Sequence, residues 1–287
     1  MASPAPKYYS ERTAKNWSEL KNLLLPLESN WGFRGQGDSS WNLETSLERA
    51  WRGQERDIAE KVAFAEYRRK ASGLRGSRLT PTNSVSLLAE MQHFGAPTRL
   101  QDWTKSFYVA AYFAFETQRD AKEVAVWAIE LAWLKGTALR KMQKADKTCR
   151  KLTIRDDLGT PHIVDHLILN NRASFVLPLT AFDMNERLGI QQGLFLCPGD
   201  VTKTFTANLL ETDKAELAKK CLKFRLSMKC RAEVLADLRK MNISAATLFP
   251  GLDGFARSLN AELFLLSQNH PMLNKVRGGV KGALIYL

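Results

Sequence analysis

The chain has 287 residues, of which 45% are hydrophobic and 25% are charged. This composition is typical of a globular protein. The length allows a sizeable core, in one large domain or in one domain plus an appendage. No stretch approaches the roughly 18 apolar residues that span a membrane, and residues 1–15 lack the apolar core of a secretion signal. The four cysteines form no CxxC pair, which argues against a zinc knuckle and a disulfide framework. We therefore expect a cytoplasmic protein.

Residues 1–15 are expected to be a disordered lead-in. Apolar residues at helical spacing then predict a helix over Asn16–Leu27, and the short apolar run Trp31–Gly35 predicts a buried strand. The following loop, Gly35–Ser40, is rich in glycine, which lets a backbone approach a ligand closely. It lacks the Gly-Lys-Ser/Thr ending of a phosphate-binding loop.

Two amphipathic helices are predicted next. Gln54–Ala71 places Ile58 and Val62 on its inner face, and a helix capped by Asn83 or Ser84 continues to His93. The polar connection Met91–Thr104 follows, and its density of hydrogen-bonding side chains indicates a binding role.

The helix predicted at Lys105–Thr117 is apolar on nearly all sides and should lie in the middle of the domain. Later strands are predicted at Val124–Leu131, Ser174–Leu177, Leu194–Leu196 and Lys223–Lys229. Later helices are predicted within Lys135–Lys151 and at Pro161–Leu169, Ala232–Met241 and Leu252–Leu266. The last of these helices is predicted to turn Phe255, Leu259 and Leu263 inward. Without a regular βαβ rhythm, this order favours an α+β fold.

The net charge of +12 is concentrated in two segments. Lys135–Lys151 carries seven basic residues and one acidic residue, and Lys214–Lys240 carries nine and three. Such segments attract nucleic acid, phosphates or an acidic protein partner. The alternative is that both are basic helix faces that serve only solubility.

Arg34 lies in a mostly apolar strand, so its guanidinium needs a partner. Two interpretations remain: a salt bridge to Asp38 or Asp102, or a clamp on a phosphate or carboxylate. Asp102 likewise either pairs with an arginine or orients His93.

Gln191 and Gln192 precede a glycine at the entry to an apolar strand. They either place an amide at a pocket or cap backbone groups in a turn. His162 and His166 have helical ligand spacing but no third ligand at a telling distance, so no metal site is predicted. A serine or cysteine hydrolase is not supported, because no G-x-S-x-G elbow is present.

Several motifs together resemble the FRG domain family, named for its Phe-Arg-Gly motif. They are Phe33-Arg34-Gly35-Gln36 with Trp41, the run from Gln92 to Thr104, Ala110-Ala111-Tyr112-Phe113-Ala114, Arg187 to Phe195, and Thr247 to Gly254. The resemblance implies a single domain over residues 16–270, followed by a tail at 271–287. It also implies a role in bacterial or phage conflict systems, with an antitoxin or inhibitor protein as a partner.

The layout is also similar to the ADP-ribosyltransferase fold, a small, mostly antiparallel split sheet surrounded by helices. That similarity implies NAD as the substrate. The residues it implies for catalysis are Arg34, Thr98, Asp102, Thr104 and Gln192, and those for holding NAD are Arg34, Gly35, Gln36, His93, Thr98, Arg99 and Gln191. Gln191 or Gln192 would stand where the transferase glutamate lies. Because glutamine supplies no charge, either the enzyme is slow, or another acid such as Asp102 contributes the carboxylate, or the domain binds without catalysis.

Overall fold

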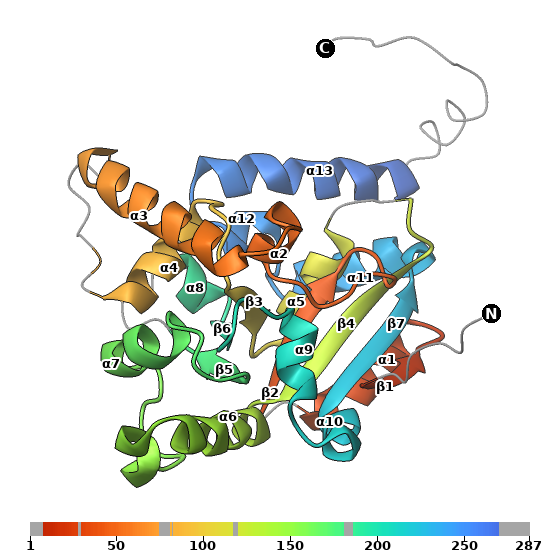
Figure 1. Ribbon diagram of the computed structural model, residues 1–287. Coiled ribbons are helices and arrows are strands. Elements are labelled where there is room, and N and C mark those ends of the chain that lie inside the picture. Colours follow the sequence, from red (N-terminus) through yellow and green to blue (C-terminus); the bar gives the residue numbers. More distant parts are fainter. Residues whose placement is uncertain are drawn as a thin grey trace.

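The computed structural model describes residues 8–27, 30–74, 81, 83–116, 120–180 and 186–269 (Figure 1). At its centre the described residues form a seven-stranded sheet in the order β1-β7-β4-β2-β3-β6-β5, with one parallel pair, β1 with β7. The predicted α+β class and mostly antiparallel sheet are therefore confirmed. The strands are β1 Ser10–Thr13, β2 Trp31–Gln36, β3 Gln101–Thr104, β4 Glu123–Glu130, β5 Val176–Leu179, β6 Gly193–Pro198 and β7 Cys221–Ser227.

Helices surround this sheet. The α-helices are α1 Trp17–Leu24, α2 Ser46–Ala50, α3 Arg56–Leu74, α4 Ser84–His93, α5 Phe107–Phe115, α6 Leu131–Ala145, α7 Pro161–Ile163, α8 Glu186–Ile190, α9 Phe205–Leu210, α10 Lys214–Lys220, α11 Arg231–Lys240, α12 Ala245–Leu248 and α13 Leu252–Asn269. Shorter 3-10 turns lie at Leu25–Leu27, Lys147–Lys151 and Met228–Cys230, and a π-helical turn at Val164–Ile168.

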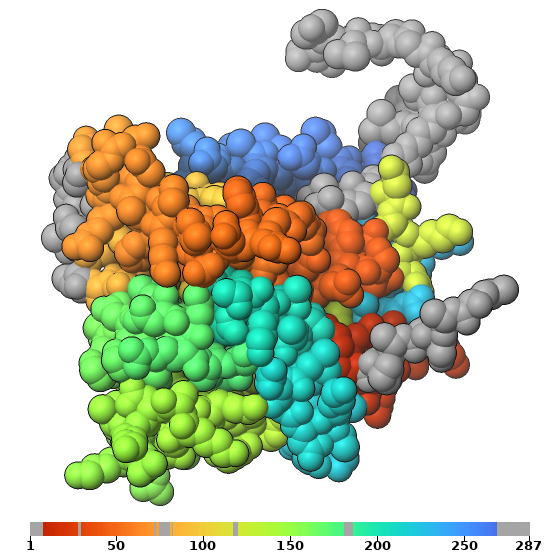
Figure 2. Space-filling view, viewed as in Figure 1, coloured from red at the N-terminus to blue at the C-terminus, as the bar shows by residue number. Residues whose placement is uncertain are grey.

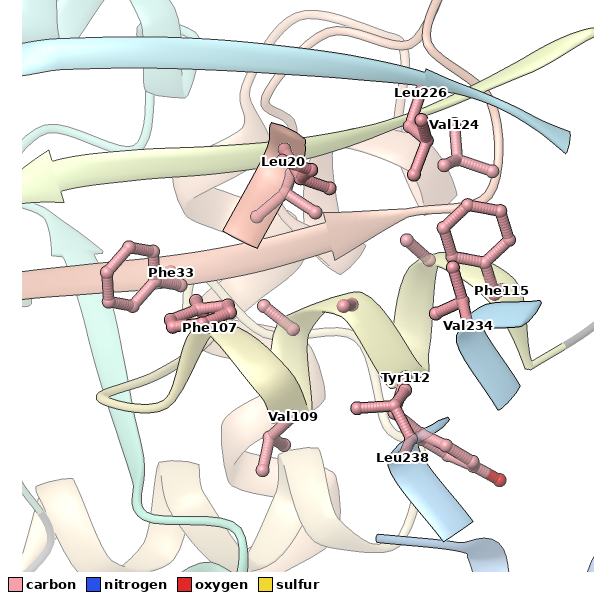
Figure 3. Packing of buried hydrophobic residues seen from close by; sticks show 14 of the residues in the cluster. Leu20, Phe33, Phe107, Val109, Tyr112, Phe115, Val124, Leu226, Val234 and Leu238 are labelled. Carbon is pink, nitrogen blue, oxygen red and sulfur yellow. The ribbon is translucent and has the colours of Figure 1, made fainter. Parts of the chain in front are cut away.

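The apolar helix α5 forms the middle of the core, as its sequence predicts. Ser106 caps its first turn by accepting from the backbone N–H of Val109. Figure 3 shows α5 against β2, with Phe33 over Phe107, and Leu238 of α11 on its other side. At its C-terminus, Arg231 donates to the carbonyls of Phe115 and Glu116 at 2.9 and 3.0 Å. The helix is thus enclosed laterally by apolar contacts and closed at its end by hydrogen bonds.

Two further apolar clusters complete the interior. On the opposite face of the sheet, α9 and α10 cover Trp103 and Trp127, which come from β3 and β4 (Figure 1). The third cluster lies where α4 and α6 pack on the β5–β6 end of the sheet. The sheet therefore has helices on both faces.

Several predicted boundaries are wrong. The predicted lead-in contains β1, whose residues pair in parallel with β7 from Ser10 opposite Leu222. Helices α9 and α10 were not predicted, and neither was α12, which lies between the predicted helices Ala232–Met241 and Leu252–Leu266. These elements have seven residues or fewer, too short for a clear apolar period. The predicted tail and residues 1–7 lie outside the described residues.

The predicted inner faces of α3 and α13 are also wrong. Ile58 and Val62 of α3 are 50% and 58% exposed, because the helix is turned to bury Glu60. On α13, the residues predicted to be buried are the exposed ones: Phe255, Leu259 and Leu263 are 58%, 41% and 66% exposed. In both helices a specific contact on the opposite face decides the orientation.

Gly35 sits where β2 crosses α5, and a Cβ there would lie 1.9 Å from the carbonyl oxygen of Ala110. We expect Gly35→Ala to lower the free energy of unfolding by about 1–3 kcal/mol or more, because backbone must move to admit a methyl group. Denaturant unfolding measures this. Gly73→Ala in exposed α3 is the matched control, since a Cβ there meets nothing within 4 Å. Equal stability of the two variants would contradict this packing.

Candidate functional site

The stretch predicted as one polar connection has three parts. It begins in the last turn of α4, continues through residues 94–100, and ends as the strand β3 in the centre of the sheet. β3 pairs with β6 at four positions but with β2 at one, Phe33 opposite Thr104. The two strands therefore diverge beyond Phe33, and Arg34 is the first residue of β2 after the point where they separate.

Arg34 fills the region where β2 and β3 separate. Its guanidinium donates to the backbone carbonyl of Asp102 at 2.6 Å, and not to Asp38 or to the Asp102 carboxylate as expected. Its Nε is buried and finds no hydrogen-bond partner among the described residues. Burial lowers the pKa of Arg34 to about 10, against the opposing charge of Asp102 and with a further contribution from Arg49. Arg34 is thus a partly buried cation whose Nε has unused donor capacity.

Asp102 is exposed on β3 and held from one side by a hydrogen-bond network. Gln92 donates its Nε2 to Oδ2 of Asp102 at 2.9 Å, and the Oε1 of Gln92 accepts from the hydroxyls of Thr98 and Ser46. Thr98 itself is fully buried. The network fixes the carboxylate, and the predicted residues Thr98 and Asp102 are joined through Gln92. The hydrogen bond to Asp102 therefore comes from Gln92, and not from the neighbouring His93 that Asp102 was expected to orient. His93 is exposed.

A second arginine, which we did not predict for the site, lies near the same carboxylate. Arg187 of α8 has its pKa lowered by burial, and the charge of Asp102 opposes that shift. Its guanidinium carbon lies 4.5 Å from the centre of the Phe249 ring, a cation–π contact. The sequence signal was present, because Arg187 opens the motif that continues through Gln191 and Gln192.

The structure gives other predicted site residues roles within the protein. Arg99 is fully buried: its Nε donates to Glu60 at 2.6 Å, and Nη1 donates to the carbonyl of Ile168 at 2.7 Å. Gln36 is buried between the carbonyl of Asn42 and the indole N–H of Trp127. Neither presents its side chain to a ligand, and Gly35 faces α5.

The Gln191–Gln192 turn lies beside Thr104. The Thr104 hydroxyl donates to the carbonyl of Gln191 at 2.7 Å, and the amide of Gln191 donates to the carbonyl of Leu248. Gln191 therefore caps a backbone group, in agreement with the second interpretation of the sequence, in which the two amides cap backbone groups in a turn. Gln192 is exposed, with a left-handed φ of 48° that favours glycine. Its side chain makes no hydrogen bond to Arg34 or Asp102 in the described part of the chain.

The basic segments differ in how many of their exposed cations are paired. In Lys135–Lys151, five basic residues are exposed: Arg140, Lys144, Lys147, Arg150 and Lys151. None of these five forms an ion pair within the described residues. Lys214–Lys240 also exposes five, but two of them, Lys219 and Arg239, pair with Glu216 and Glu262. The first segment, at the lower left of the molecule in Figure 2, is the more open cationic surface.

No metal site is found among the residues described. They contain no group of three or more histidine, cysteine, aspartate or glutamate side chains placed to hold an ion, and their four cysteines are free. His162 stacks on His166, which contacts Asp146 at 2.9 Å. No described helix has the length and apolar character required to cross a membrane.

Comparison with known families gives the class of this domain. Residues 29–123 match the family model of the FRG domain, so the chain carries an FRG domain, as its motifs indicate. The match contains Arg34, Gln92, Thr98 and Asp102, whereas Arg187 and Phe249 lie beyond it. No curated protein and no solved structure matches the chain.

Because Arg99 is fully buried, the loss of its acidic partner should be severe. We expect Glu60→Gln to lower the free energy of unfolding by about 3–5 kcal/mol, since it leaves a buried guanidinium without its counter-charge. Thermal unfolding followed by circular dichroism measures this. Glu66→Gln, on the exposed face of the same helix, is the control and should leave the midpoint unchanged. A similar midpoint for both variants would show that the Arg99–Glu60 pair does not support the fold.

Proposed function

We propose that this FRG domain binds NAD through Arg34 and Arg187 and transfers ADP-ribose to a macromolecular target. The observation that carries the proposal is the charge balance around Asp102. Two guanidinium groups with pKa values lowered by burial lie near one exposed carboxylate, and the Nε of Arg34 has no partner among the described residues. An anion would supply the missing charge and accept the unused donor, and a diphosphate suits the planar donors of arginine.

The reaction requires a negative charge near the ribose. Breaking the bond between nicotinamide and C1′ of the ribose builds positive charge on the sugar, and a fixed carboxylate stabilises it. The acceptor nucleophile then bonds to C1′, loses its proton to a base, and nicotinamide leaves with the bonding electron pair. Gln192 cannot supply the charge, so we assign this role to Asp102, which Gln92 holds in place.

The biological setting follows from the family resemblance. Members are associated with bacterial and phage conflict systems, and we extend that role to this chain, with an antitoxin or inhibitor protein as its regulator and the cytoplasm as its site of action.

Removal of Arg34 tests the binding site. Arg34→Ala should weaken NAD binding by about 1.5–3 kcal/mol, roughly 10- to 150-fold, because a charged hydrogen-bond donor is lost. Isothermal titration calorimetry measures the affinity, and circular dichroism confirms the fold. Arg69→Ala, an exposed arginine of α3, is the control and should bind as the parent does. If Arg34→Ala is unfolded, Arg187→Ala provides the same comparison. Unchanged affinity in both site variants would remove the assignment.

Asp102→Asn separates an enzyme from a binding module. It keeps the shape of the side chain and removes its negative charge, so NAD affinity should be kept or raised while release of nicotinamide falls by roughly 100-fold or more. The readouts are nicotinamide release and transfer of label from radioactive NAD to proteins and nucleic acids. Binding by the parent chain without any release of nicotinamide would favour the alternative, a non-catalytic module that recognises a nucleotide, a nucleic acid or a phage protein.

The exposed cations of Lys135–Lys151 favour nucleic acid as the target. We expect the chain to bind single-stranded RNA or DNA with an affinity that falls steeply with salt, because neutralised phosphates release counterions. The double variant Lys144→Glu/Lys147→Glu should weaken binding and flatten the salt dependence. Lys214→Glu/Lys219→Glu is the matched control in the second basic segment. Binding that does not respond to salt, or equal losses in both variants, would exclude this surface.

A further inference from the structure

Helix α13 presents its large apolar side chains to solvent. Five of them lie along one side of the helix at spacings of three, four, four and three residues: Leu252, Phe255, Leu259, Leu263 and Leu266 are 85%, 58%, 41%, 66% and 58% exposed. With a rise of 1.5 Å per residue, this apolar stripe is about 21 Å long. Exposed apolar surfaces of this extent mark interaction sites in soluble proteins.

The inner part of α13 packs on the protein through small residues together with Phe264 and Leu265. Gly254 and Ser258 are buried there, and Ala261 is half-buried. A Cβ at Gly254 would lie 1.7 Å from the carbonyl oxygen of Phe249, so the helix backbone lies directly on the end of α12. This orientation is fixed, and the helix cannot turn its leucines inward. In Figure 2 the blue surface of α13 forms the upper margin of the molecule, with no other coloured element above it.

A groove with basic residues on its rim runs beside the stripe. It lies between α11 and α13, has a volume of about 410 Å³, and is lined by Ala236, Leu265 and Leu266 with Arg239, Lys240 and Glu262. Arg239 spans the groove to Glu262 at 3.0 Å, and Lys240 next to it makes no ion pair within the described residues. The surface therefore combines an apolar stripe with a rim of two cations and one carboxylate, and Lys240 is the cation of that rim left unpaired within the described residues.

We propose that this surface binds an acidic amphipathic helix of a partner protein. The partner's apolar residues would cover the stripe, and its carboxylates would face Arg239 and Lys240 across the groove. Two helices packed in this way bury the side chains that α13 leaves in water, and the charge on α11 fixes the orientation and favours acidic partners. This proposal is independent of the function proposed for the Arg34 site.

Charge distinguishes this occupant from two others. A second copy of the chain would bring the same Arg239 and Lys240 rim, and a second net charge of +12, to the contact. A membrane surface is bound by helices rich in lysine and arginine, whereas α13 carries Arg257 alone against Asp253 and Glu262. An acidic protein helix satisfies both the stripe and the rim.

The test uses the full chain and two labelled synthetic helical peptides. Both carry leucine at the a and d positions of four heptads; one has glutamate at the flanking positions and the other lysine. Fluorescence anisotropy should show saturable binding of the glutamate peptide and at least roughly tenfold weaker binding of the lysine peptide. Leu259→Asn/Leu263→Asn should weaken binding by roughly tenfold or more, and Arg239→Glu/Lys240→Glu should remove the preference for glutamate.

Ile58→Asn/Val62→Asn is the matched control, because it removes two exposed apolar residues from α3 and should leave binding unchanged. Equal binding of both peptides, or no effect of the leucine variant, would overturn the proposal. A dimer in light scattering would also overturn the proposal if the leucine variant abolished that dimer. Binding to phosphatidylglycerol vesicles would overturn it in the same way if the leucine variant abolished that binding. Tighter peptide binding after Leu284→Ser/Ile285→Ser would assign the stripe to the end of this chain and would also overturn it.

Discussion

The buried ion pair between Arg99 and Glu60 fixes the arrangement on which the candidate site depends. Arg99 is fully enclosed, and its guanidinium also binds the carbonyls of Ile168 and Pro198. Removing any of these partners leaves a charged group unsatisfied in a dry interior, so α3, the π-helical turn and the end of β6 must stay together. Because Arg99 directly follows Thr98, the same constraint positions the buried Thr98, which is joined through Gln92 to the exposed carboxylate of Asp102.

The pair also explains why the apolar period of α3 misleads. The pattern of Ile58 and Val62 predicts an inner face, and hydrophobic burial alone would select it. Glu60 lies on the side of the helix opposite to Ile58 and Val62. Burying Glu60 therefore turns those two residues toward water. Leaving a buried arginine unpaired costs several kcal/mol of folding free energy. This is more than the hydrophobic stabilisation that is lost when two aliphatic side chains stay half exposed. A charge pairing distant in sequence therefore overrides the local pattern.

The sequence was most informative where one pattern dominates. The apolar run of α5 and the strand containing Arg34 were predicted, and Asn83 was one of the two residues predicted to cap α4. Three of the five FRG motifs lie within the matched residues 29–123. Residue type did not separate ligand-facing groups from internal ones: Arg34 and Arg99 look alike in sequence, and only their partners distinguish them. β3 was missed because its alternation of polar and apolar residues is hidden by polar side chains, Gln101 and Thr104, that are buried through hydrogen bonds.

The C-terminal helices connect the apolar stripe of α13 to the candidate site. Phe249, at the end of α12, lies under the guanidinium groups of both Arg187 and Arg257, at 4.5 and 3.9 Å from the ring centre. Arg257 belongs to α13 and also pairs with Glu116, and Gln191 donates to the carbonyl of Leu248. Phe249 therefore contacts one arginine beside the candidate site and one arginine of α13, so the two surfaces share the same ring.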